Sequence, residues 1–288
     1  KILHITDLHL RHNGRLFYST GKKINNGLIL NGHNVLNISD RDLTNQKKSL
    51  FDIGSKKFLL NQILKNINNF KPDLILFGHV DRLNYESFLK IKEKYPSIRL
   101  AQWFLDPLIL LGHVDLVGCH IFIYLKEKYS SIRFAQWFLD PLIKKGPDYE
   151  KNKNRFFLKY QFCDANFITT SIDVLNFVNK NKTFFIPNPI DSSIDVHRNY
   201  ESDKPIDLFI AISHGQHRGI LKRDFIDDRV KLIIKLIKKI SYNIFGHQNN
   251  PVWGQDYFNE LIKCSMAINL SRGAPIKYYS SDRVASLL

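Results

Sequence analysis

A regular alternation of short apolar runs with longer amphipathic segments constrains the fold more than any other feature of this sequence. The first apolar run, Lys1 to Thr6, is followed by a polar loop and by a helix predicted from Lys22 to Asn31. A second apolar run then spans Asn34 to Ser39. Strands that alternate with helices pair in parallel, because each helix carries the chain back along the sheet. The sequence therefore predicts an α/β fold.

The same alternation continues along the rest of the chain. Further strands are expected at 73–77, 165–169, 183–186, 207–212, 243–245 and 266–270. Further helices are expected at 56–69, 154–160, 171–179, 229–240 and 256–264. The last three strands and their helices form a βαβαβ unit of their own, which is typical of half a Rossmann-like fold. We therefore predict an N-terminal Rossmann-like domain at 1–188, a polar linker at 189–206 and a second Rossmann-like domain at 207–288.

An internal repeat with a spacing of 34 residues lies in the first domain. Residues 76–109 match residues 110–143, and the nine residues Ala101 to Ile109 recur unchanged as Ala135 to Ile143. Each copy has the pattern loop, helix, strand, and two copies are too few to build a solenoid core. We expect a tandem duplication inserted in the α/β domain. One copy would keep the normal place in the sheet, and the other would add an edge unit, bulge out or displace its twin.

The balance of charge narrows the choice of partners. Lys and Arg number 42 against 27 Asp and Glu, which gives a formal net charge of +15 and a field that attracts polyanions. The basic residues are scattered and form no nucleic-acid-binding module, so a nucleic acid is a poorer candidate than the anionic surface of a membrane. The three cysteines are odd in number and far apart, which is typical of a reducing compartment. We expect a cytoplasmic protein with peripheral contact to the inner face of the membrane.

The first post-strand loop contains a motif that suggests metal chemistry. Asp7-Leu8-His9 resembles the opening motif of calcineurin-like metallophosphoesterases, in which a carboxylate and an imidazole bind one of two metal ions. That family also needs Gly-Asp-x-x-Asp and Gly-Asn-His-Asp/Glu. The nearest match to the first, residues 78–81, lacks the bridging carboxylate, and the second has no match. We therefore keep this activity as an alternative, expect no bound metal, and expect Asp7 and His9 to be ordinary polar loop residues.

Two post-strand loops of the second domain carry groups that suit a diphosphate. In the first, Ser213 to Lys222, glycines let backbone N–H groups approach an anion, and Arg218 and Lys222 add positive charge. The second, Ser271 to Arg283, brings hydroxyls, a carboxylate and two tyrosines to the start of a predicted helix. The candidate residues are Ser213, His214, Gly215, Arg218, Lys222, Lys277, Tyr278, Tyr279, Ser280, Ser281, Asp282 and Arg283. The alternatives are a solvated basic loop and an ordinary helix N-cap.

Five stretches, at 11–18, 135–140, 186–191, 213–222 and 277–283, together resemble bacterial glycosyltransferases of the CgeB-like, group 1 type. The resemblance implies a GT-B fold, with two Rossmann-like domains facing a cleft. It implies that the second domain binds a nucleotide-sugar and the first binds a cell-surface glycan or a lipid-linked acceptor. No cofactor beyond the nucleotide-sugar co-substrate is implied, because protein cations and helix dipoles stabilise the leaving diphosphate. The family's second domain continues past the point at which this sequence ends, so we expect an incomplete donor domain.

Glycosyl transfer also requires a base that accepts the proton of the acceptor hydroxyl. His12, in the first post-strand loop, is our candidate because its unperturbed pKa lies near neutrality. Asp106 and Asp140, which occupy the same position in the two repeat copies, are its rivals. The acceptor side is expected to include Asn13, Gly14 and Arg15. A non-catalytic basic binding protein remains the alternative to an enzyme.

Overall fold

The structure is a computed structural model, and it describes residues 1–46, 55–78, 80, 82, 83, 85–103, 126–129, 133–139, 141, 142, 149–195, 201, 203–212, 228–237, 240–246 and 249–270. These residues fall into two compact units. Unit 1 contains Lys1–Arg11 and Ser19–Pro189, and unit 2 contains His12–Tyr18 and the described residues from Ile190 onward. Every strand pairing between the described strands is parallel, so the chain has an α/β fold of Rossmann-like character.

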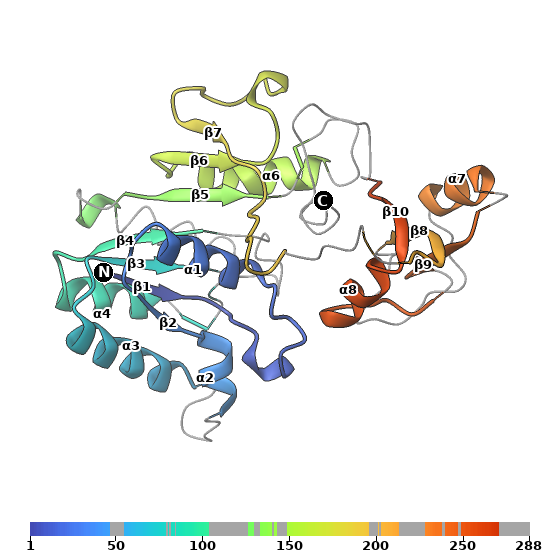
Figure 1. The fold of residues 1–288 in the computed structure, drawn as a ribbon. Coiled ribbons are helices and arrows are strands. Elements are labelled where there is room, and N and C mark those ends of the chain that lie inside the picture. The colour runs from blue at the N-terminus through green and yellow to red at the C-terminus, as the bar shows by residue number, and fades with distance from the viewer. Residues whose placement is uncertain are drawn as a thin grey trace. The chain divides into compact units, whose positions relative to one another are not determined.

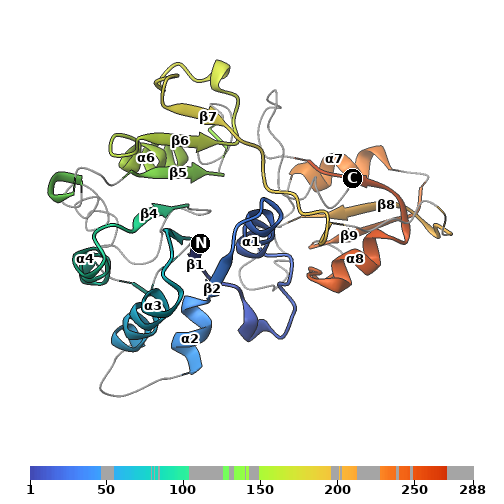
Figure 2. The ribbon, with the colours of Figure 1, turned by 60° about the vertical axis from the view of Figure 1, so that its left-hand side comes forward.

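The first sheet of unit 1 has the strand order β2-β1-β3-β4. Its strands are β1 (Ile2–Ile5), β2 (Val35–Ile38), β3 (Leu74–Phe77) and β4 (Arg99–Gln102). The connecting helices are α1 (Thr20–Leu30), α2 (Asp40–Gln46), α3 (Lys56–Phe70) and α4 (Tyr85–Lys94). Helix α1 covers one face of the sheet and α3 and α4 the other (Figures 1 and 2). The strand order reverses beside β1, and in open α/β sheets ligands bind at the carboxyl ends of the strands at such a point.

Helix α3 shows why these residues form this unit. Leu59, Ile63 and Ile67 recur at intervals of four, which places them on one helical face, and all three are buried in the same core as β1 and β3. Burying each such side chain stabilises the fold by roughly 1.5–3 kcal/mol. The helix ends at Lys71, which has a left-handed backbone with φ of 50°. The predicted helix at 56–69 is confirmed.

A second parallel sheet in unit 1 has the order β5-β6-β7. Its strands are β5 (Ala135–Phe138), β6 (Ala165–Ile168) and β7 (Thr183–Phe185), and helix α6 (Tyr149–Tyr160) joins the first two. Phe138 and Phe156 pack edge to face with ring centroids 5.6 Å apart, inside a core that includes Ile168. The strands expected between Asn34 and Phe185 all form, but they are divided between two sheets.

The helix expected at 171–179 is wrong, because only a single 3-10 turn, η3 (Ile172–Val174), forms there. Backbone groups that a helix would use are bonded elsewhere. The N–H of Asn179 donates to the hydroxyl of Tyr160, and the N–H of Asn181 donates to the Asn179 side chain at 2.9 Å. Apolar side chains of this segment pack against the core around Phe156 instead of lining a helical face.

Unit 2 has the expected order strand, helix, strand, helix, strand. Its elements are β8 (Ile206–Ala211), α7 (Asp228–Leu236), β9 (Tyr242–Phe245), α8 (Gln255–Leu261) and β10 (Cys264–Ile268), and its sheet order is β10-β8-β9. Helix α8 is shorter than predicted, because Cys264 pairs with Ile206 as the first residue of β10. No helix within the described part of the chain is both long enough and apolar enough to cross a membrane.

Candidate functional site

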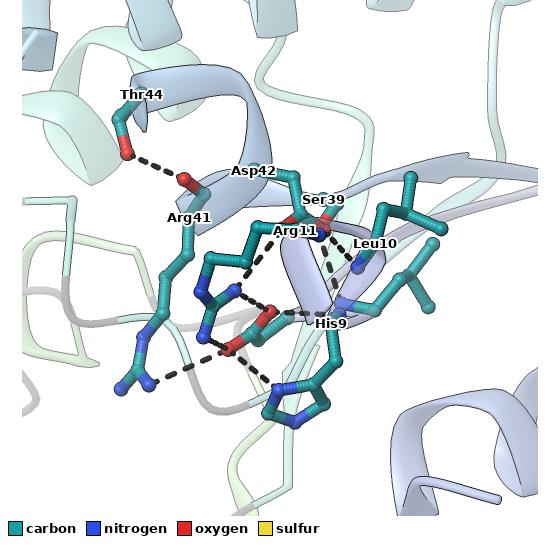
Figure 3. Close-up of polar contacts among 9 residues, drawn as sticks. His9, Leu10, Arg11, Ser39, Arg41, Asp42 and Thr44 are labelled. Atoms are coloured by element: carbon teal, nitrogen blue, oxygen red, sulfur yellow. Dashed lines mark hydrogen bonds and ion pairs between the residues drawn. The ribbon is translucent and has the colours of Figure 1, made fainter. Parts of the chain in front are cut away.

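A compact polar cluster lies at the carboxyl ends of β1 and β2 (Figure 3). Its members are Asp7, His9, Arg11, Ser39, Arg41 and Asp42. The two carboxylate side chains are only 4% exposed, whereas those of Arg11 and Arg41 are 24% and 23% exposed. The cluster therefore holds two buried negative charges beneath two guanidinium groups that reach solvent.

The carboxylate of Asp7 is the centre of the cluster. The guanidinium of Arg11 donates to both of its oxygens, at 2.6 and 2.8 Å, and Arg41 adds an ion pair at 3.4 Å. The backbone N–H of His9 donates to Oδ1 at 2.9 Å, and the His9 ring nitrogen Nδ1 lies 3.3 Å from Oδ2. Burial by itself would raise the pKa of Asp7, but the hydrogen bonds and charges of Arg11 and His9 outweigh it and lower that pKa.

The carboxylate of Asp42 holds the next part of the loop. It accepts from the backbone N–H groups of Leu10 at 2.9 Å and Arg11 at 3.0 Å, and from the hydroxyl of Ser39. Ser39 in turn accepts from the N–H of Leu8 at 3.0 Å. With the bond from His9 to Asp7, all four backbone N–H groups from residue 8 to residue 11 donate to side chains.

Ser39 and Asp42 escaped the sequence analysis although a signal was present. Ser39 immediately precedes α2 and Asp42 lies in its first turn, which is the spacing of a capping box. The pattern marks a helix start, and nothing in it indicates that the same carboxylate also holds the loop after β1. That second role depends on the parallel pairing of β1 with β2, which brings the two strand ends together.

This geometry bears on the metal motif. Both oxygens of Asp7 bind guanidinium groups, so a metal ion at Asp7 and His9 would have to displace Arg11. Within the described residues, no three His, Cys, Asp or Glu side chains form a group that could hold a metal ion. The Asp-x-His spacing serves here to fold the loop, since the carboxylate of Asp7 caps the N–H of His9, whose backbone has φ of 60°.

The point of strand reversal beside β1 is tightly packed. A Cβ atom on Gly78, which follows β3, would lie 2.3 Å from Thr6 Oγ1 and 2.6 Å from the Trp103 ring, so only glycine fits there. The indole N–H of Trp103 donates to Nε2 of His4 at 3.2 Å. Burial lowers the pKa of His4 to about 4, although a hydrogen bond with Asn37 opposes the shift, so the imidazole is neutral at physiological pH.

The predicted residues His12, Asn13, Gly14 and Arg15 form an exposed turn that belongs to unit 2. His12 is the last residue of η1 (Leu10–His12), the turn continues from it, and the N–H of Arg15 donates to the carbonyl of His12 at 3.0 Å. Asn13 and Gly14 both have left-handed backbones, with φ of 51° and 81°. The structure therefore places these four consecutive residues in one exposed segment.

Aromatic contacts anchor this turn within unit 2. The Arg15 guanidinium lies over the Trp253 ring, 4.7 Å from its centroid, and the rings of Phe17 and Tyr18 contact Phe258 at 5.9 and 6.1 Å. A Cβ atom on Gly254 would lie 2.5 Å from the Arg15 carbonyl oxygen. Sequence reasoning missed Trp253, Gly254 and Phe258, because contacts across more than 200 residues leave no local pattern.

The remaining candidates lie outside the described residues. They are Asp106, Asp140, Ser213, His214, Gly215, Arg218, Lys222, Lys277, Tyr278, Tyr279, Ser280, Ser281, Asp282 and Arg283. The strands that precede the two predicted donor loops are described: β8 ends at Ala211 and β10 at Ile268, and these two strands are hydrogen-bonded neighbours. No family model, curated protein or solved structure matches the chain.

Proposed function

We propose that this protein is a GT-B glycosyltransferase that moves a sugar from a nucleotide-sugar to a cell-surface glycan or a lipid-linked acceptor. One observation carries the proposal. The two loops with diphosphate-binding chemistry follow β8 and β10, which are adjacent, while β9 lies on the other side of β8. The strand order thus reverses between these two strands, and that is where α/β sheets bind nucleotides. The two loops, at 213–222 and 271–283, therefore follow neighbouring strands in sequence, and this strand order supports the proposal.

The donor loops supply complementary chemistry. Arg218 and Lys222 offset the charge of the diphosphate, and this stabilises the leaving group as the glycosidic bond breaks. Lys277 and Arg283 add further positive charge, and Ser280 and Ser281 offer hydroxyls at the start of the last helix. Asp282 accepts from a ribose hydroxyl, and Tyr278 or Tyr279 stacks on the base.

The acceptor chemistry is assigned to the turn after η1. His12 is exposed there and accepts the proton of the attacking hydroxyl, while Asn13, Gly14 and Arg15 contact the acceptor. Asp106 and Asp140 stay rival bases. The net charge of +15 supports a peripheral approach to anionic membrane, where lipid-linked acceptors lie.

Calorimetric titration with UDP, GDP and ADP in excess EDTA tests the donor site. We expect one of the three nucleotides to bind, and Arg218→Ala to weaken that binding at least about tenfold, because hydrogen bonds to charged groups contribute roughly 1.5–3 kcal/mol. Lys235→Ala removes an exposed positive charge from α7 and is the matched control that should leave binding unchanged. Equal weakening by both variants would indicate non-specific attraction. If none of the three nucleotides binds, the titration is repeated with the complete gene product, and absence of binding there would contradict the proposal.

A second experiment separates transfer from the alternatives. The nucleotide that binds is supplied as its sugar conjugate, and release of the free nucleotide is followed with and without added divalent metal. Release in EDTA supports a metal-independent glycosyltransferase. Hydrolysis of a phosphomonoester that depends on added metal and is lost in Asp7→Asn would favour the phosphoesterase instead.

A further inference from the structure

Strands β4 and β5 come from the corresponding part of the two repeat copies and overlap at two repeat positions, yet they belong to different sheets. With the spacing of 34, Ala101 and Gln102 of β4 correspond to Ala135 and Gln136 of β5. Strand β4 pairs with β3, and β5 pairs with β6. The two strands contact each other within unit 1, but among the described strands neither is hydrogen-bonded to the other (Figures 1 and 2).

The two copies use opposite edges of this strand. In copy 1, the odd-numbered Arg99 and Trp103 donate their backbone N–H groups to carbonyls of the β3 segment, at 3.2 and 2.9 Å. In copy 2, the even-numbered Phe134 and Phe138 accept with their carbonyls from N–H groups of the β6 segment, at 3.3 and 3.4 Å. The spacing of 34 preserves this odd and even alternation, and successive residues of a strand direct their backbone groups to opposite edges. A single copy therefore has a separate edge for each partner.

The registers are also compatible. Ala101 lies opposite Leu76 of β3, and its counterpart Ala135 lies opposite Ala165 of β6. Superposing the two copies on one strand places Leu76, the shared alanine and Ala165 in one row across the sheet. Neither partner strand has to slide for one copy to pair with both.

The tryptophans at the corresponding position of the two copies, Trp103 and Trp137, also differ in their hydrogen bonds. Trp103 of copy 1 is buried, and its indole N–H donates to His4 in the first sheet. Its counterpart, Trp137 of copy 2, has a buried indole nitrogen with no hydrogen-bond partner among the described residues. A buried donor without a partner costs free energy, so copy 2 carries a group whose natural partner lies in the other sheet.

For the corresponding glutamines, Gln136 and Gln102, it is copy 2 that makes the hydrogen bond and copy 1 that does not. Gln136 of copy 2 is buried and donates to Oδ1 of Asn166 on β6 at 2.6 Å. Its counterpart, Gln102 of copy 1, is partly exposed and has no such partner within the described residues. Copy 1 thus makes the bond from tryptophan to His4 without the bond from glutamine to Asn166, and copy 2 makes the second bond without the first.

We propose that the strand of either repeat copy fits the same position in a single six-stranded parallel sheet. The presence of both copies divides that sheet into the two sheets of unit 1. In that sheet the order is β2-β1-β3-β4-β6-β7, with one Ala-Gln-Trp-Phe strand in place of both β4 and β5. Its tryptophan bonds His4 and its glutamine bonds Asn166. The chain with one copy removed therefore folds into the continuous sheet. This inference is independent of the glycosyltransferase proposal, because it rests on the strand pairing and side-chain hydrogen bonds of unit 1 and on no ligand or activity.

Deletion of residues 104–137 tests the proposal. The deletion joins Trp103 to Phe138 and so restores the Trp-Phe sequence found in both copies. We expect cooperative urea unfolding with a midpoint at least as high as that of the full chain. We also expect stronger hydrogen-exchange protection in the peptide that contains residues 99–103, because the shared strand would then be paired along both of its edges. A deletion variant that is unfolded, or that unfolds at lower urea than the full chain, would overturn the proposal.

The repeat itself supplies matched controls for a second test in the full chain. Gln136→Leu should lower the urea midpoint of unit 1 by roughly 0.5 M, because a buried hydrogen bond is lost, and Gln102→Leu should not. In the deletion variant Gln102 is the only copy, so Gln102→Leu should there lower the midpoint as Gln136→Leu does in the full chain. Equal effects of the two replacements in the full chain would refute the division of contacts, whether or not the deletion variant folds.

Discussion

The ion pair between Arg11 and Asp7 gives the sharpest test of the polar cluster. Replacing Arg11 with Met keeps an unbranched apolar stem and removes the guanidinium that binds both oxygens of Asp7 at 2.6 and 2.8 Å. The carboxylate is 4% exposed in the native protein, so it depends on these donors rather than on water for most of its hydrogen bonds. The variant therefore isolates the cost of leaving a buried negative charge without its main partner.

The expected magnitude follows from the remaining partners. Breaking a buried ion pair by removing one partner costs about 3–5 kcal/mol. Asp7 retains the N–H of His9 at 2.9 Å and the Arg41 ion pair at 3.4 Å, so the loss should fall near the lower limit, at roughly 3 kcal/mol. Asp7→Asn combined with Arg11→Met removes the uncompensated charge and should recover about half of that loss.

The same variant should change how stability depends on pH. In the native protein the pKa of Asp7 lies below its ordinary value despite burial, because Arg11 and His9 stabilise the ionised form. A lowered folded-state pKa gives stability that is present above the unfolded pKa, about 3.9, and is lost as the pH falls through the lower folded value. Without Arg11, burial raises the pKa of Asp7, so acidification from pH 7 to pH 5 should destabilise the variant less than the native protein, or stabilise it.

Urea unfolding of the two single variants, the double variant and the native chain at pH 7 and pH 5 measures both effects. Arg133→Met is the matched control, because that arginine is 75% exposed and lies 3.7 Å from Asp164, so its loss should cost less than about 1 kcal/mol. The reasoning is refuted if Arg11→Met costs no more than Arg133→Met, or if the double variant is no more stable than Arg11→Met alone.

Two further predictions concern the turn after η1. Gly254→Ala should destabilise unit 2 by roughly 1–3 kcal/mol, because its φ of 61° disfavours any Cβ and the added atom would meet the Arg15 carbonyl. The control Gly27→Ala, in a helix with open space around it, should instead stabilise the protein. Thermal unfolding followed by tryptophan fluorescence distinguishes the two variants. His12→Ala should lower glycosyl transfer at least roughly a hundredfold with nucleotide affinity unchanged, whereas exposed His33→Ala should leave both intact; unchanged turnover would remove His12 from the mechanism.

Local sequence patterns located most of the secondary structure. Short apolar runs predicted β1, β3 and β8, because a short buried strand requires little more than that pattern. The spacing of Leu59, Ile63 and Ile67 predicted α3 for the same reason. The helix predicted at 171–179 was wrong although the apolar residues of this segment have helical spacing. The N–H of Asn179 donates to the hydroxyl of Tyr160, which belongs to α6.

Long-range relations were beyond the reach of those patterns. The two repeat copies share the sequence Ala-Gln-Trp-Phe in this strand region, so nothing in that sequence indicates which copy pairs with β3 and which with β6. The sequence also did not indicate that Arg11 donates to Asp7, because the motif around Asp7 and His9 suggested a metal site instead. Of the candidate site, the turn at His12 could be found from sequence, but its contact with Trp253 could not.

The locked loop after β1 has a consequence for binding entropy. Four successive peptide N–H groups, from Leu8 to Arg11, are already held by side chains before any ligand arrives. Fixing the backbone of one residue costs about 1–2 kcal/mol of conformational entropy, and in this stretch that loss occurs during folding. A ligand that meets the adjoining turn at His12 therefore does not have to order the residues that lead into it, and more of its contact energy remains as affinity.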